Sequence, residues 1–308
     1  MPSTFGASLP RTNLNKRDNR GVDVMLKHRN RIGQFVYHVN PMISWARGKY
    51  VELQEEVSDD PDWNYRYVRE GHWDDRQWGY LTDGFFMSQE EIDNHPVDQD
   101  LTGNTTLRVG DLKYKDINED GVIDWKDQRV IGSSGLPNLM YSIDMGFGYK
   151  GIQLSMLWQG AGMYMVNFSG SAAAPFSNES IPLEIHYKYR AKIETGPDGD
   201  FIANADEFKL PPGTQNGRTN NNAKPSDFWS YDTHYMRLKN LNLSYSLPKR
   251  FLRPAGINDC VFYLSATNLL TFDNLGIWKH DFDPEVVGQN GRDYPPVKTV
   301  TLGLRFTF

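Results

Sequence analysis

The sequence lacks the features that mark several common protein classes. Its one cysteine, Cys260, excludes an internal disulfide framework and a cysteine-rich metal site. No run approaches the ~18–20 apolar residues that a membrane-spanning helix needs. Lys and Arg (33) are fewer than Asp and Glu (39), which argues against a nucleic-acid-binding surface. Residues 1–21 contain no apolar core of a signal peptide, which taken alone predicts a cytoplasmic protein.

Signatures of catalysis are also missing. The seven His form no H-x-x-x-H pair, and no G-x-S-x-G elbow occurs. Adjacent acids stand at 59–60, 74–75 and 90–91, but nothing in the sequence fixes the ~5–9 Å separation that a glycosidase needs between its two carboxylates. We therefore predict that the chain is not an enzyme.

Aromatic residues are abundant, with 16 Tyr, 16 Phe and 8 Trp, and they alternate with polar residues as in β-strands. The clearest alternation is at the C-terminus, where Val300, Leu302, Leu304, Phe306 and Phe308 are separated by small or polar residues. Seven segments show such a pattern: 21–29, 32–46, 137–149, 152–165, 233–247, 258–272 and 296–308. The sequence therefore predicts an all-β fold.

The connections between these segments alternate between short and long. Tight links at 30–31, 150–151 and 248–257 alternate with long ones at 47–136, 166–232 and 273–295. This pattern is typical of a transmembrane antiparallel β-barrel with short periplasmic turns and long extracellular loops. Strands of ~9–15 residues fit a tilted bilayer crossing, whereas a soluble sandwich, the alternative, usually has strands of ~5–6 residues.

The alternation also predicts which side chains face lipid. Outward-facing residues are Leu139, Ile143, Phe147, Leu302, Leu304 and Phe306. Lumen-facing residues are Asn138, Ser142, Asp144, Thr301 and Arg305. A one-residue slip would place Arg305 in lipid, at a cost of up to ~2–4 kcal/mol.

One segment has the spacing of a calcium loop, D-x-[DN]-x-[DN]-G-x5-[DE]. It predicts oxygen ligands for a structural Ca²⁺ from Asp116, Asn118, Asp120, the Val122 carbonyl, Asp124 and Asp127. Asp at the last position is shorter than the usual Glu, which weakens bidentate ligation. The alternative is a solvated Asp- and Gly-rich turn without an ion.

The loop 47–136 also carries many aromatic residues among its carboxylates. Aromatic faces stack on sugar rings, so this loop is a candidate glycan-contacting surface. Packing of the loop on itself or on a partner is the alternative for any one of these residues.

Several segments resemble motifs of the SusC/RagA family of TonB-linked outer-membrane proteins, in the family's order. They are REGHWDDRQWGYLTDGFFMSQEEID (69–93), GDLKYKDINEDGVIDWKDQRVIG (110–132), NNNAKPSDFWSYDTHYMRLKNLNLSYSLPKRFL (220–252), VFYLSATNLLTF (261–272), FDPEV (282–286) and YPPVKTVTLGLRFTF (294–308). The resemblance covers the chain from about residue 10 to 308. It implies about seven C-terminal strands of a 22-stranded barrel.

The resemblance also implies a function. Such receptors take up oligosaccharides or peptides across the outer membrane, with a SusD-like lipoprotein over the extracellular mouth and energy from the TonB complex. The plug, the TonB box, the signal peptide and the earlier strands have no counterpart here, so we expect a fragment or the remnant of a broken gene. The chain would then contact TonB only through the missing N-terminal part. The alternative function is a secreted, calcium-stabilised, β-rich carbohydrate-binding module.

Overall fold

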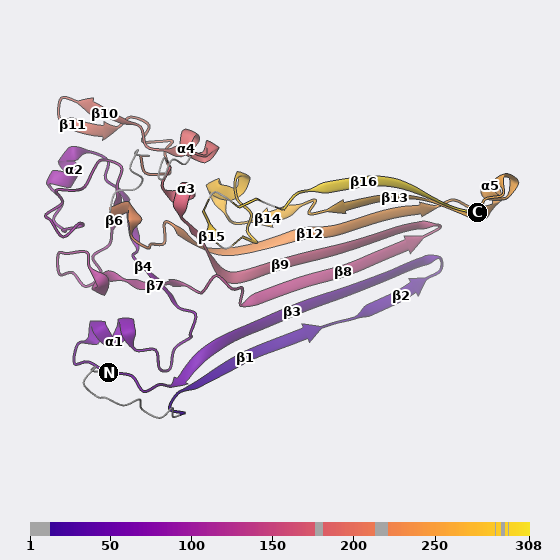
Figure 1. The fold of residues 1–308 in the computed structure, drawn as a ribbon, viewed down its shortest axis with the longest axis horizontal. Helices are drawn as coiled ribbons and strands as arrows, with labels where there is room; N and C mark the ends of the chain where they lie inside the picture. The colour runs from indigo at the N-terminus through magenta and orange to yellow at the C-terminus, as the bar shows by residue number, and fades with distance from the viewer. Residues whose placement is uncertain (1–12, 176–180, 213–220, 287, 291–292, 295) are drawn as a thin grey trace, which may run out of the picture.

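A computed structural model describes residues 13–175, 181–212, 221–286, 288–290, 293–294 and 296–308. Its main feature is one long antiparallel sheet (Figure 1). Seven strands follow one another in chain order across the sheet: β1 (Lys16–Met25), β3 (Phe35–Glu52), β8 (Leu139–Tyr149), β9 (Ile152–Phe168), β12 (Ser230–Ser246), β13 (Asp259–Thr267) and β16 (Thr299–Thr307). Among the described residues, β1 and β16 form the two edges, and they do not pair with each other. The structure therefore confirms an all-β barrel segment that is not closed.

Short strands extend this sheet. The strand β2 (His28–Ile32) pairs with β3, while β14 (Thr271–Asp273) pairs with β12 and β15 (Gly288–Gln289) runs parallel to the end of β9. The segment predicted as one strand, 21–29, is thus divided between β1 and β2. The segment predicted over 258–272 ends at Thr267, where Asn268 adopts a positive φ of 51°.

Tight turns connect the strands at one end of the sheet. The β8–β9 turn consists of Lys150 and Gly151, with φ of 45° and 88°, and positive φ at both central residues is the requirement of a type I′ hairpin. The tight link expected at 30–31 is wrong. The chain turns instead at residues 33–34, because Gly33 adopts φ 63°.

The strand register separates apolar from polar side chains. Phe147, Leu154, Leu243, Leu264 and Leu302 are consecutive partners across five strands. The neighbouring row, on the opposite face, is Gly146, Ser155, Asn242, Ser265 and Thr301. The predicted separation of these side chains onto two faces is confirmed, and Leu302 is 78% exposed on the apolar one.

The long connections carry the remaining elements, and they gather at the opposite end from the tight turns (Figure 1). Residues 47–136 contain α1 (Pro61–Tyr67), β4 (Gln77–Gly79), β5 (Thr82–Phe85), α2 (Gln89–Asp93), β6 (Leu112–Tyr114), η2 (Trp125–Asp127) and β7 (Arg129–Gly132). Residues 166–232 contain α3 (Gly170–Ala173), α4 (Glu184–Tyr189), β10 (Ile193–Gly196), β11 (Gly199–Ile202) and η4 (Asn221–Ala223). The third connection contains η6 (Gly276–His280), and α5 (Lys249–Leu252) and η5 (Arg253–Ala255) lie at the turn end.

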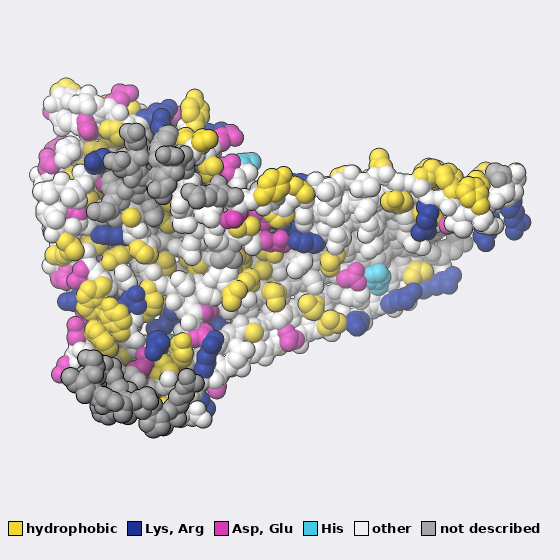
Figure 2. Space-filling model, viewed as in Figure 1, with side chains coloured by type: hydrophobic (Ala, Val, Ile, Leu, Met, Phe, Trp, Pro, Cys, Tyr) yellow, Lys and Arg dark blue, Asp and Glu magenta, His cyan; other side chains and the backbone are white. Residues whose placement is uncertain are grey.

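The main hydrophobic core lies in this group of loops. Each long connection contributes buried side chains: Leu112 and Ile123 from the first, Ile185 and Trp229 from the second, and Trp278 from the third. Figure 2 shows yellow hydrophobic side chains over the loop end, while the visible middle of the sheet is mostly white. Among the described residues, no helix combines the length and apolar character needed to cross a membrane.

Candidate functional site

The first two long loops form one folded body, joined by a ladder of side-chain hydrogen bonds. Asn222 accepts from the backbone N–H of Leu112 at 2.8 Å and donates to Asp111 at 2.6 Å. Asn221 donates to the Leu112 carbonyl at 2.6 Å, and the Tyr114 hydroxyl donates to the Asn221 carbonyl at 2.8 Å. All of these residues are buried, so the bonds are shielded from competing water.

The third loop is fixed to the sheet by buried charges. Arg237 of β12 has a side chain only 2% exposed, and its Nη2 lies 2.6 Å from Oδ2 of Asp283. Its Nη1 lies 3.1 Å from Glu285, which also pairs with Lys239 at 2.9 Å. The Tyr164 hydroxyl donates to the Pro284 carbonyl at 2.6 Å. These contacts hold the FDPEV motif (282–286) against strands β9 and β12 of the sheet.

The predicted calcium loop has a compact local geometry. Gly121 adopts φ 84°, and its N–H donates to Asp116 Oδ2 at 2.7 Å. Val122 N–H donates to Asp120 at 3.1 Å, and Asp124 Oδ1 accepts from Lys126 N–H at 2.7 Å. Asn118 donates to Asp120 rather than pointing to a common centre.

The last residue of the calcium loop, Asp127, is buried. Its two oxygens accept from the N–H groups of Ile117 and Asp124, at 2.8 and 2.9 Å. Burial raises the pKa of Asp127, more than these two hydrogen bonds lower it. Within the described residues, no group of three or more His, Cys, Asp or Glu side chains is placed to hold a metal ion.

The adjacent acids of the first loop have structural partners. Asp60 caps α1, accepting from Asp62 N–H at 2.9 Å, and Asp75 pairs with Arg47 at 2.8 Å. Glu91 pairs with Lys113 at 2.5 Å. These contacts are those of capping and ion pairing, and none sets up two free carboxylates as a glycosidase requires.

The aromatic residues of the first loop lie among arginines. A hollow of about 360 Å³ is lined by Trp73, Trp78, Arg66 and Arg76, with Tyr50 of β3 and Tyr67 of α1 at its sides. The candidate surface predicted from the sequence comprises the aromatic residues of loop 47–136 but not its arginines. The signal was present as the alternation of Arg with Tyr and Trp between residues 65 and 78.

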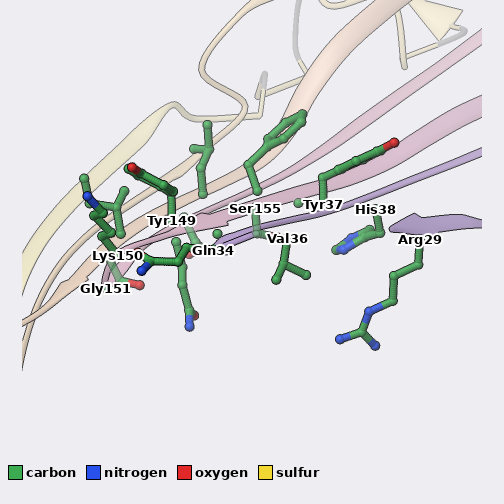
Figure 3. Close-up of a pocket in the computed structure, with 17 residues that line it drawn as sticks. Arg29, Gln34, Val36, Tyr37, His38, Tyr149, Lys150, Gly151 and Ser155 are labelled. Atoms are coloured by element: carbon green, nitrogen blue, oxygen red, sulfur yellow. The ribbon is translucent and has the colours of Figure 1, made fainter. Parts of the chain in front are cut away.

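A second hollow, of about 560 Å³, lies on the polar face of the sheet near the tight turns. Figure 3 shows Arg29 and His38 to one side of it and the Lys150–Gly151 turn to the other. His38 lies 3.4 Å from Asp144, to which Asn40 also donates at 3.0 Å. Charged and amide groups therefore line this face of the wall.

Comparison with known proteins identifies relatives. No family model matches the chain. The chain is 28% identical to TonB-dependent receptor P26 of Formosa agariphila over 242 residues, which are 73% of this chain and 22% of that protein. It is 24% identical to TonB-dependent receptor P3 of the same organism, over all of this chain and 30% of the relative. The chain thus spans less than a third of the length of these curated relatives.

Solved structures show the same fold. The RagAB peptide importer in the open-open state matches with a TM-score of 0.58 and 15% identity, over 96% of this chain and 29% of the other. The RagAB peptide transporter matches with a TM-score of 0.59, 18% identity and the same coverage. The motifs, the register of the strands and these comparisons agree, and the chain is similar to a barrel segment of TonB-dependent receptors of the SusC/RagA type.

Proposed function

We propose that the chain supplies barrel wall and extracellular loops to an outer-membrane importer of oligosaccharides or peptides. The importer would be energised through TonB and covered by a SusD-like lipoprotein. The carrying observation is the sheet itself, with seven consecutive antiparallel strands whose register puts apolar side chains on one face. In water such a face would be unfavourable, whereas lipid accommodates it.

The polar face and the loop body support the same proposal. The face around Arg29, His38 and Asp144 would line the lumen, against the plug of the complete receptor. The loop body lies at the end opposite to the C-terminus, which makes it the extracellular mouth if the chain ends at the periplasmic side. Capture of substrate between this body and the lipoprotein would precede TonB-driven movement of the plug.

A genetic uptake experiment tests this proposal. In cells that carry the gene, we expect its deletion to abolish uptake of the labelled oligosaccharides or peptides on which the cells grow, and the intact gene to restore it. A protonophore should block uptake while leaving surface binding intact, because TonB coupling depends on the proton gradient. Undiminished uptake after deletion would contradict the proposal.

The alternative, a secreted carbohydrate-binding module, differs in its solvent requirement. A module with a self-contained core is soluble alone, whereas the sheet described here exposes Leu302 and Phe306, and its main core lies at the loop end. Sedimentation with and without detergent separates the two, since only the module remains monomeric without detergent.

We propose in addition that the 116–127 loop binds a structural Ca²⁺ through Asp116, Asn118, Asp120, the Val122 carbonyl, Asp124 and Asp127. The types and spacing of the oxygen donors support this proposal, although the described side chains do not converge on one centre, so the loop would close around the ion on binding. Oδ1 of Asp116 is buried and accepts no hydrogen bond from the described residues. Oxygen donors are the ligands that Ca²⁺ prefers, and the ion would supply the positive charge that this oxygen lacks. The Asp98–Val122 bridge would transmit the resulting rigidity to the neighbouring loop segment.

Calorimetry with CaCl₂ tests the ion site. We expect weak binding by the detergent-solubilised chain, at least tenfold weaker binding by Asp120→Ala, and unchanged binding by the control Asp200→Asn on β11. Asp120 is the suitable position because its side chain is exposed and its removal leaves the core of the loops intact. Equal Ca²⁺ binding by the unchanged chain and by Asp120→Ala would contradict the proposed ion site.

A further inference from the structure

The hollow between α1 and the segment preceding β4 combines aromatic rings with guanidinium groups. We name it the arginine pocket, defined by Arg66, Arg76, Trp73 and Trp78. The guanidinium carbon of Arg66 lies 4.7 Å from the centre of the Trp78 ring, and that of Arg76 lies 5.2 Å from it. Two cations therefore share one aromatic ring.

The charges around the pocket are unequally compensated. Arg69 pairs with Glu55 at 3.1 Å, and Asp74 pairs with Arg17 of β1. Arg66 and Arg76 have no ion-pair partner among the described residues. Their recorded bonds go to neutral acceptors: Arg66 Nε donates to the Gln128 side chain, and Arg76 Nη2 donates to the Val68 carbonyl, both at 2.9 Å.

The charges of Arg66 and Arg76 destabilise each other. Burial, together with the charge of Arg66, lowers the pKa of Arg76 below its ordinary value. Half-buried like charges repel each other, and each guanidinium has further N–H groups that donate no hydrogen bond within the described part of the chain. A carboxylate or sulfate between the two guanidiniums would accept paired hydrogen bonds and cancel the repulsion.

We propose that the arginine pocket binds the acid group of a charged saccharide unit, a uronate or a sulfated sugar, at the mouth of the importer. The inference rests on the proposed function and names its substrate class. Trp73 and Trp78 line the same hollow, and indole rings are common contacts of sugar rings. Glu55 and Asp74 also line the hollow, but they are paired with Arg69 and Arg17 and leave the charges of Arg66 and Arg76 uncompensated.

A fluorescence titration tests the pocket directly, since Trp73 and Trp78 report on its occupant. The detergent-solubilised chain would be titrated with trigalacturonate, a sulfated galactotriose, neutral galactotriose and triglutamate. We expect at least one acidic saccharide to bind about tenfold or more tightly than neutral galactotriose, and to weaken as salt rises. The two acidic saccharides distinguish carboxylate from sulfate.

Three variants locate the site. Arg66→Gln and Arg76→Gln should each weaken acidic-saccharide binding about tenfold, while Arg66→Lys should have an intermediate effect because it keeps the charge and loses the planar fork. Arg250→Gln is the matched control, because Arg250 also stacks on an aromatic ring, Phe251, but lies at the opposite end of the sheet. Unchanged near-ultraviolet circular dichroism of Arg66→Lys would show that the pocket stays folded.

The outcomes separate this inference from the import proposal. Equal binding of neutral and acidic saccharides, tighter binding of triglutamate, or full binding by both glutamine variants would each overturn the assignment of the pocket. None of these results would alter the loss of uptake on gene deletion. Conversely, a chain that binds trigalacturonate through Arg66 but supports no uptake would leave the pocket assigned and refute the importer.

Discussion

Replacing Asp283 by Asn should loosen the third long loop, 273–295, from strand β12 of the sheet. Asp283 faces Arg237 at 2.6 Å, and their side chains are 12% and 2% exposed. Removing one partner of a buried ion pair costs about 3–5 kcal/mol, because the remaining charge is left uncompensated. Glu285 still contacts Arg237 at 3.1 Å, so we expect the lower end of this range, about 3 kcal/mol.

Hydrogen exchange of the detergent-solubilised chain measures this effect. A cost of about 3 kcal/mol corresponds to roughly a hundredfold loss of amide protection in residues 271–286, because each 1.4 kcal/mol is about tenfold. The control Asp293→Asn changes an exposed acid near the same loop and should leave protection unchanged. Full protection in Asp283→Asn would refute the view that these buried charges hold the loop.

Three further predictions concern pH, register and the sheet edges. Burial lowers the pKa of His186, whose Nδ1 accepts from Leu183 N–H, so the unfolded loop binds more protons than the folded one. The stability of the α3–α4 region should therefore be full above pH ~6.5 and fall as the pH drops below it. Limited proteolysis measures this acid sensitivity. It should be lost in His186→Gln and kept in the control His280→Gln, which changes an exposed residue. A nitroxide label attached at Leu304→Cys should be accessible to a quencher dissolved in the lipid, whereas a label at Arg305→Cys should not be accessible. The reverse result would disprove the predicted register. Because β1 and β16 leave backbone groups unpaired in the described residues, the chain alone should form oligomers in detergent, and a heat-modifiable, conducting monomer would contradict this expectation.

The strands were predictable from the sequence because their signal is local and periodic. One residue in two is apolar over nine or more positions, and the period of two fixes both the strand and its faces. The turn at 150–151 was found at the correct position, while the one at Gly33 was missed because the polar residues Asn30 and Arg31 also suit a turn. The glycine of the calcium-loop spacing, Gly121, adopts a positive φ of 84°, again a local property.

The loop body was not predictable in the same way. Its bonds join residues more than 100 positions apart, such as Asn222 and Asp111, and no periodic pattern marks either partner. The arginine pocket is likewise a matter of spatial contact. Arg66 and Arg76 stand ten positions apart in the chain, and only folding places both over Trp78.

The hydrogen-bond ladder between Asn221, Asn222 and the strand β6 limits how such receptors acquire new specificities. Asn222 Oδ1 and Asn221 Nδ2 bond to the backbone of Leu112 and Asn222 Nδ2 bonds to Asp111, so replacing either loop alone would leave buried polar atoms without partners. Recombination between receptor genes should therefore succeed when both loops, 47–136 and 166–232, are exchanged together. The two loops therefore act as one structural unit, although two strands, β8 and β9, separate them in the chain.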